Sequence, residues 1–351
     1  MEARQKFLGW TGCLLDPKCS PGEHRQAAHD WCGWAMRELG IEENSIGDGE
    51  SPAMVRTDLP SGQAISPQRA ALCVREHQRT AVFLQAMAAA IRAARERFPG
   101  ETIHVVEAGC GPLAALTLPF MARHAPGEVD FTLIDFHEVS LAGVRRLAET
   151  LGVAASVRAC IAGDAAAVRF AEAERPHIVA CEVLRRALKK EPQVAVTQAL
   201  APQLREGGFF LPERIEVDLG ILHGGRQLRR FSGESDAGEP EPIERIGRVF
   251  CLDAYRTVDL EVLASRRIKA GCVSVAPQAK AHPPLQLFTR LTVFREHTLG
   301  DFDCSLTTPE RLRYPAELTA RGGVAKFSYE ISGDPGLRLE VAKPVDTNRG
   351  H

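Results

Sequence analysis

The sequence lacks an excess of charge of either sign. Its 43 lysines and arginines nearly balance 45 aspartates and glutamates, which gives a formal net charge of −2 and a pI near 6.6. Domains that bind nucleic acid or an anionic membrane carry an excess of basic residues, because they must neutralise phosphates. The composition therefore predicts neither kind of partner.

The sequence also lacks a long apolar run. The longest weakly polar segment, Ala81–Ile91, is rich in alanine, is interrupted by Gln85 and is too short to span a bilayer. The N-terminal residues MEARQKFLGW carry charges where a signal peptide would have its apolar core. We therefore expect a cytoplasmic protein that is not embedded in a membrane and whose ten cysteines are reduced thiols.

The close pair of cysteines typical of a zinc finger is missing as well. Five residues that could bind a metal gather near the N-terminus: Cys13, Cys19, His24, His29 and Cys32. The spacing of the two histidines is common among zinc ligands, but Cys13 and Cys19 stand too far apart in the chain to form the usual pair. Cys32 shares a predicted helical face with apolar residues, which is typical of a core cysteine. The sequence therefore predicts no metal site.

The first of three segments, residues 1–98, is predicted to be helical. It holds all three tryptophans, a connector rich in glycine, serine and proline from Asn44 to Pro67, and a helical pattern from Pro67 to about Arg97. Pro99 and Gly100 end that pattern.

The second segment, residues 99–222, alternates apolar runs with helical patterns. The predicted strands are TIHVVEAG, VDFTLID, ASVRACI, PHIVACEV and REGGFFLP, the last of which leads into RIEVDLGIL. Helices are predicted from near Pro112, after VDFTLID, and over about Pro192–Leu204. Such an alternation predicts an α/β domain with a parallel sheet covered on both faces.

The third segment, residues 223–351, has a different pattern. A polar loop at Ser232–Pro242 precedes five short alternating runs, namely RVFCLDAY, TVDLEVLA, GCVSVA, LQLFTRLTVF and AKFSYEIS. These runs predict an antiparallel β domain, either a barrel or a sandwich.

A glycine-rich loop in the second segment, VVEAGCGPLAAL, indicates a ligand site. Glu107 ends an apolar strand, and Gly109, Cys110 and Gly111 follow before Pro112. Glycines at such a turn let the main chain approach a ligand closely. At the end of a strand in a doubly wound sheet, this arrangement is typical of a nucleotide-like ligand. Read as GxGxxA, it is also compatible with a dinucleotide.

Further residues follow in a recognisable order. Asp135 ends the second strand, Gly163 and Asp164 follow the third, and LREGGFFLP lies near the fifth. Together with the glycine loop, they resemble class I S-adenosylmethionine (SAM)-dependent methyltransferases. The resemblance implies a Rossmann-like, doubly wound SAM-binding domain, with Asp135 on the ribose hydroxyls, Asp164 at the adenine and Glu107 near the polar tail of SAM.

A second resemblance is to the protein arginine methyltransferases. The segment VREHQRTAVFLQAM is similar to the helix before their SAM domain, which implies that Arg79 binds the SAM carboxylate. Glu182 and Glu191, in CEVLRRALKKE after the fourth strand, match the "double-E" hairpin of that family and are the candidate catalytic residues. The order of a helical segment, a SAM-binding domain and a β domain also matches.

Three features of the family are absent. No tyrosine precedes residue 250, so the N-terminal Tyr-Phe motif is missing, and Thr289 is followed by Arg290 rather than by His-Trp. Inside the hairpin, basic residues replace the family's aromatic and Met residues, and they would repel a guanidinium if they faced the pocket. We therefore expect a methyltransferase for a small acceptor, with a carboxylate-bearing one as the better fit.

Other functions stay open at this point. SAM could itself be the substrate, through cyclisation to azetidine-2-carboxylate or aminocarboxypropyl transfer, with release of methylthioadenosine. A non-catalytic scaffold with this fold and an NAD-linked oxidoreductase also stay open, as does a homodimer.

Overall fold

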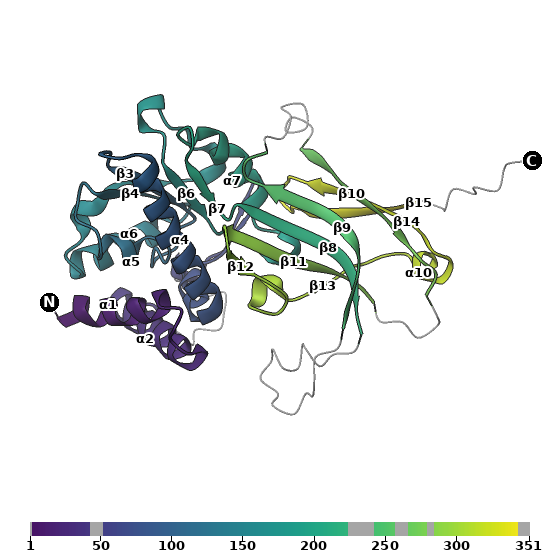
Figure 1. The fold of residues 1–351 in the computed structure, drawn as a ribbon, viewed down its shortest axis with the longest axis horizontal. Coiled ribbons are helices and arrows are strands. Elements are labelled where there is room, and N and C mark those ends of the chain that lie inside the picture. The colour runs from purple at the N-terminus through teal and green to yellow at the C-terminus, as the bar shows by residue number, and fades with distance from the viewer. Residues whose placement is uncertain (1, 43–51, 224–241, 257–265, 279–283, 343–351) are drawn as a thin grey trace, which may run out of the picture.

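The computed structural model describes residues 2–42, 52–223, 242–256, 266–278 and 284–342. Figure 1 shows the N-terminal helices beneath a parallel sheet, with antiparallel strands extending away on the other side of the molecule. No helix in these ranges combines the length and apolar character that crossing a membrane would require.

The N-terminal segment begins with the helical hairpin α1 (Glu2–Leu15) and α2 (Pro21–Leu39). Ser20 and Glu23 form a capping box at the start of α2, which satisfies two main-chain N–H groups that the helix leaves unpaired. Aromatic residues join the two helices, since Phe7 packs edge-on against Trp31 with the ring centres 5.6 Å apart. Both helices contact α4 (His77–Arg97).

The prediction of one unbroken helix from Pro67 to Arg97 is wrong. The chain forms α3 (Pro67–Leu72), a 3-10 turn (Cys73–Arg75) and then α4. Glu76 breaks the helix with a non-helical ψ of 72°. Its carboxylate instead accepts hydrogen bonds from the main-chain N (2.8 Å) and the hydroxyl (2.6 Å) of Ser305, so a contact with the β domain accompanies the break.

The parallel sheet of the second segment is present as predicted. Its order is β5-β4-β3-β6-β7, and every neighbouring pair is parallel. The strands are β3 (Ile103–Ala108), β4 (Val129–Asp135), β5 (Val157–Ala162), β6 (Ile178–Cys181) and β7 (Phe209–Leu211). Helix α7 (Gln193–Leu200) packs on one face, while α4 and α6 (Glu138–Thr150) pack on the other. The α/β fold class is therefore confirmed.

The helix predicted to begin near Pro112 begins later in the structure, at Leu118. Turns occupy the chain up to Thr117, and only α5 (Leu118–Met121) is helical. Ala114 has a left-handed φ of 40°, and the buried carboxylate of Glu107 accepts hydrogen bonds from Leu116 N and the Thr117 hydroxyl. These side-chain hydrogen bonds satisfy donors in the turns, so regular helix starts later than the sequence pattern indicates.

The described residues after β7 form two antiparallel sheets. One has the order β12-β11-β8-β9 with β13 also on β11, and the other is β10-β14-β15. Their strands are β8 (Arg214–Leu222), β9 (Ile243–Asp253), β10 (Arg267–Val275), β11 (Leu285–Phe294), β12 (His297–Leu299), β13 (Glu310–Arg311), β14 (Gly323–Glu330) and β15 (Gly336–Ala342), with helix α10 (Ala316–Arg321) before β14. The predicted strand TVDLEVLA, and the polar loop at 232–242 apart from its last residue, lie outside the described residues.

Strand β8 belongs to this antiparallel architecture. It pairs with β9 on one side and β11 on the other, although the sequence pattern placed RIEVDLGIL at the end of the second segment. We propose that the domain boundary lies between β7 and β8.

The expected connector contains a small hairpin. Strands β1 (Thr57–Leu59) and β2 (Gly62–Ala64) pair with each other after a 3-10 turn (Pro52–Met54). This hairpin was not predicted, because its strands are too short to leave a periodic pattern.

Candidate SAM-type site

A large cavity lies at the carboxyl ends of the parallel strands. Its volume is about 1340 Å³, and its walls include the glycine loop, the ends of β4 and β6, the start of α4 and the β1–β2 hairpin. All the residues predicted for the site line this cavity: Arg79, Glu107, Gly109, Cys110, Gly111, Asp135, Asp164, Glu182 and Glu191. Open parallel sheets bind ligands at this edge, where neighbouring loops diverge.

The glycine loop is tightly fixed at Gly109. Its φ is 74°, its N–H donates to Ile134 O over 2.8 Å, and a β-carbon there would overlap the side chain of Val183. Any larger residue would meet both a left-handed backbone and this overlap, so glycine is required at this position. The neighbouring Cys110 is buried, and its burial raises the pKa of the thiol, which makes it a packing residue rather than a nucleophile.

Glu107 is buried beneath the loop. Its carboxylate accepts hydrogen bonds from Leu116 N (3.2 Å) and from the hydroxyl of Thr117. Burial raises the pKa of Glu107 to about 8, although these two hydrogen bonds oppose the shift. Glu107 therefore organises the turns after the loop, as well as lining the cavity.

Asp135 holds the same loop from the second strand. Its two oxygens accept from Gly111 N and His137 N, each over 2.8 Å. Burial raises the pKa of Asp135, against the effect of those hydrogen bonds. Asp164 plays a similar local part, because its carboxylate accepts from Ala166 N over 2.9 Å. Carboxylate oxygens can accept further hydrogen bonds, so neither role excludes a ligand hydroxyl or amine.

Arg79 and Glu182 form a largely buried ion pair between α4 and the end of β6. Arg79 also lies 3.5 Å from Glu76, from Nη1 to Oε1. Burial would lower the pKa of Arg79, but the two glutamates hold it well above its usual range. Burial raises the pKa of Glu182 against the effect of Arg79. Glu182 Oε1 is itself buried and has no hydrogen-bond partner among the described residues.

Glu191 belongs to the same charge cluster. Burial and the nearby carboxylate of Glu182 raise its pKa to about 7, while Arg79 and Arg185 act in the opposite direction. The structure therefore brings together the two glutamates that the sequence spacing suggested. A carboxyl group with a pKa near neutrality can exchange a proton at neutral pH.

The hairpin between the two glutamates has a strained backbone. Three residues other than glycine have left-handed φ values, namely Ala187 (55°), Leu188 (54°) and Lys190 (68°). Such conformations cost free energy and persist only where surrounding contacts impose them. Here Ala187 N donates to Thr289 Oγ1, and the Tyr329 hydroxyl donates to Leu188 O, each over 2.8 Å. The β domain thus holds the hairpin in shape.

Two of the four basic residues in the hairpin are already paired. Glu310 accepts from Arg186 Nε at 2.7 Å and from Lys189 Nζ at 2.6 Å. Burial of Glu310 would raise its pKa, but the two cations lower it below the usual value. Arg185 and Lys190 line the cavity, as Arg186 does, whereas Lys189 does not. The expected repulsion of a guanidinium is therefore reduced, because Glu310 offsets part of the positive charge.

Sequence reasoning missed the β1–β2 hairpin as part of the site. Gln63 N donates to Lys190 O over 2.7 Å, and a β-carbon on Gly62 would come within 2.7 Å of that same oxygen. Gly62 also has a φ of 148°. The only available signal was the glycine-rich composition of the connector, which does not say what the connector contacts.

We compared the sequence with protein families and curated proteins, and the structure with solved structures. The sequence matches no protein-family model and no curated protein. The structure of PRMT6 with SAH has a TM-score of 0.51 and 14% identity, covering 77% of this chain and 98% of that chain. The Trypanosoma brucei PRMT1 enzyme–prozyme heterotetrameric complex with AdoHcy has a TM-score of 0.49 and 14% identity, covering 77% and 92%.

The chain has a PRMT-like fold. The PRMT6 match covers 77% of this chain, and the described N-terminal helices, parallel sheet and antiparallel strands follow the PRMT-like layout that the resemblance to class I SAM-dependent methyltransferases implied. At this level of identity the likeness concerns architecture, and it assigns no substrate.

Proposed function

We propose that this protein binds SAM and transfers its methyl group to a small acceptor. One observation carries the proposal: the Arg79–Glu182 ion pair and Glu191 line the same cavity as the glycine loop. The PRMT6 neighbour was solved with SAH, the product that remains after SAM gives up its methyl group.

The residues present fit SAM. The main chain at Gly109 and Gly111 has no side chain to keep a ligand away, and the Arg79 guanidinium can form a two-point contact with the amino-acid carboxylate. The unpartnered Glu182 Oε1 can accept a hydrogen bond from the ammonium group of the same ligand end. Asp135 keeps acceptor capacity for ribose hydroxyls. When bound, SAM supplies a methyl group already activated by its sulfonium.

The chain then has to align an acceptor, take up its proton and exclude water. We assign proton uptake to Glu191, because a pKa of about 7 leaves part of its carboxylate ionised and basic at neutral pH. Glu182 stays bound to Arg79 and orients the reacting groups. The β1–β2 hairpin restricts access of water through its contact with the main chain of Lys190.

The acceptor side favours a small molecule with an anionic group. Arg185 and Lys190 line the cavity, while Glu310 pairs with Arg186 and Lys189. A carboxylate on the acceptor could pair with Arg185 while its nucleophilic atom faces Glu191. We place this activity in the cytoplasm, where thiols stay reduced.

The test is to identify what SAM becomes. Purified protein is incubated with methyl-labelled SAM and a panel of small amino, hydroxy and carboxylic acids, and products are separated by mass spectrometry. We expect SAH together with a labelled acceptor. Methylthioadenosine in place of SAH would overturn methyl transfer and support cyclisation or aminocarboxypropyl transfer.

A binding measurement distinguishes a SAM-binding enzyme from a scaffold and from an oxidoreductase. We expect SAM, and not NAD(P), to raise the melting temperature, because a ligand that binds only the folded state stabilises it. No response to SAM at millimolar concentration would contradict the proposal and favour a non-catalytic scaffold. A response to NAD(P) alone would support an oxidoreductase.

A further inference from the structure

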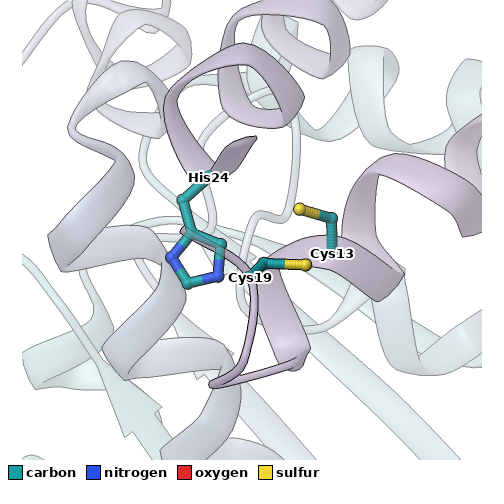
Figure 2. A group of neighbouring side chains, drawn as sticks. All are labelled: Cys13, Cys19 and His24. Atoms are coloured by element: carbon teal, nitrogen blue, oxygen red, sulfur yellow. The ribbon is translucent and has the colours of Figure 1, made fainter. Parts of the chain in front are cut away.

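A cluster of thiol and imidazole groups lies where α1 meets α2. One donor atom from each of Cys13, Cys19 and His24 lies within 4.8 Å of the other two. Figure 2 shows the two thiols approaching each other with the His24 ring beside them. Within the described residues, no other group of three such side chains comes this close. None of the three lines the SAM-type cavity.

This proximity differs from what the sequence spacing suggested. Cys13 belongs to the last turn of α1, Cys19 to the loop, and His24 to the first turns of α2. The turn at residues 16–20 folds the chain back, so two cysteines that stand apart in sequence meet in space. Because Cys13 and Cys19 stand apart in the sequence, no metal site was predicted. In the fold, however, the two residues lie close together.

The distances are close to those a zinc ion requires. With Zn–S bonds of about 2.3 Å and Zn–N bonds of about 2.0 Å in a tetrahedron, the donors stand roughly 3.5–3.8 Å apart. Donors already within 4.8 Å of one another need to shift by only about 1 Å, which small side-chain rotations can supply.

The main chain holds the three side chains in place. Asp16 O accepts a hydrogen bond from Cys19 N (3.2 Å) and lies 3.1 Å from His24 Nε2. The capping box of Ser20 and Glu23 sets the direction of α2, and His24 N donates to Ser20 O over 3.0 Å. Two of the candidate ligands therefore contact one carbonyl, and the third, Cys13, lies in the last turn of α1. Zinc binding through His24 Nε2 would replace its contact with Asp16 O.

The donor set selects the kind of ion. Two thiolates and an imidazole are soft or borderline ligands, which favour zinc over magnesium or calcium. The two thiolate charges would be neutralised by a divalent cation. All three side chains are only partly buried, so solvent can reach the centre and supply a fourth ligand.

We propose that Cys13, Cys19 and His24 form a zinc site that fastens the end of α1 to the start of α2. The bound ion holds the helical hairpin that packs against α4, the helix that carries Arg79. The proposed role of the ion is to stabilise this helical hairpin, and the role is independent of the proposed methyl transfer.

Cobalt titration of the reduced, metal-free full-length protein tests this directly. Co²⁺ reports its own ligands, since thiolate coordination gives intense near-ultraviolet charge-transfer bands and tetrahedral geometry gives strong visible bands. We expect both sets of bands to saturate at one equivalent and to disappear when zinc is added. Metal analysis of protein purified without chelator should find about one zinc per chain.

Matched variants locate the ion. We expect Cys19→Ser to abolish the charge-transfer bands or reduce them strongly, and His24→Ala to weaken zinc binding at least tenfold. Cys272→Ser, at an exposed cysteine on β10, and His29→Ala, at an exposed histidine on α2, should bind like the wild type. Zinc should raise the melting temperature of the wild type and of both controls, and should not raise that of Cys19→Ser.

Two results would overturn the proposal. One is a reduced wild-type protein with no cobalt bands and no bound zinc. The other is a Cys13–Cys19 disulfide in protein purified under reducing conditions, detected by peptide mass spectrometry, because the pair would then be a redox site. Both measurements use the wild type, so they hold even if a variant fails to fold.

Discussion

The two pairs of carboxylates in the cavity are held in different ways. Glu107 and Asp135 accept hydrogen bonds from main-chain N–H groups and a hydroxyl of their own α/β domain. Glu182 and Glu191 instead flank a strained hairpin that the β domain holds, and Glu182 pairs with an arginine from α4. The glycine-loop side of the proposed cofactor site is therefore fixed locally. The proposed amino-acid end, at Arg79 and Glu182, and the proposed acceptor side depend on contacts between segments far apart in the chain.

From this difference we infer that the proposed acceptor side can change more readily than the glycine loop. The glycine loop is restrained by glycine conformation and by nearby backbone groups, so its geometry tolerates little change. The hairpin carries exchangeable charges, and its shape is set by a few contacts from Thr289, Tyr329 and Glu310. On the proposed function, we expect substitutions between Glu182 and Glu191 to affect the acceptor more than SAM.

The largest expected effect comes from Glu182→Gln. Loss of the charge leaves Arg79 without its main partner and removes the orienting carboxylate, so turnover should fall about 10²–10⁴-fold. The measurement is the initial rate of SAH release at saturating SAM. Glu296→Gln, at an exposed glutamate beside His297, serves as the control and should keep the wild-type rate. Wild-type turnover by Glu182→Gln would exclude this residue from the reaction.

Gly109→Ala should damage the cofactor side selectively. The new methyl group meets both a left-handed backbone and Val183, so SAM affinity should be lost along with about 2 kcal/mol or more of unfolding free energy. Gly152→Ala is the matched control, because Gly152 has a similar φ of 67° with nothing within 4 Å of the added carbon. It should cost about 1–2 kcal/mol and leave SAM binding intact. Equal costs for the two variants would rule out a role for the Val183 overlap.

The pH dependence of the rate should show whether Glu191 acts on the acceptor without affecting SAM binding. If Glu191 takes up the proton, the rate at saturating substrates rises with pH through about 7, because only the ionised form is basic. Glu191→Gln should remove that limb while SAM affinity stays unchanged. A pH–rate limb that persists in Glu191→Gln would assign the proton uptake to another group.

Ionisation of Glu107 should lower the free energy of unfolding as pH rises, whereas the rate is expected to increase. Glu107 has a folded-state pKa of about 8, above the ordinary value of 4.5, so between these values the folded state binds more protons than the unfolded state. The contribution of Glu107 to the unfolding free energy therefore decreases as pH rises from about 4.5 to 8. Chemical denaturation across this range should show a shallower decline for Glu107→Gln than for wild type. An unchanged slope would mean that Glu107 ionises normally.

The smallest expected effect is that of Tyr329→Phe. This change removes the hydrogen bond from the hydroxyl to Leu188 O and should cost about 0.5–1.5 kcal/mol of unfolding free energy. Because the strained hairpin then relaxes, we expect the KM for the acceptor to rise several-fold while the Kd for SAM stays constant. Tyr314→Phe is a matched control, since the Tyr314 hydroxyl accepts from Leu285 N at the start of β11 instead. If Tyr329→Phe changed the Kd for SAM and left the KM for the acceptor unchanged, the hairpin would not act on the acceptor as proposed.

Local sequence features predicted much of the fold and the position of the site. The alternation of apolar runs and helical patterns predicted the parallel sheet, and VVEAGCG predicted the glycine loop. The predicted helix boundaries were wrong where side chains form hydrogen bonds that interrupt or delay a helix. Glu76 accepts hydrogen bonds from Ser305 at the break before α4, and Glu107 accepts them from Leu116 and Thr117 before α5. Such hydrogen bonds depend on partners that a local pattern does not identify.

The sequence by itself determined the order of the segments, the strand edge at which the cavity forms and the glycine-rich turn after β3. These features follow from periodicity and backbone preference, which act over a few residues. Only the tertiary structure decided that Glu182 pairs with Arg79, that Glu310 takes up Arg186 and Lys189, and that Cys13 meets Cys19 and His24. Those pairings depend on the path of the chain between distant residues, because charge and hydrogen-bonding capacity do not specify a partner until the fold brings the groups together.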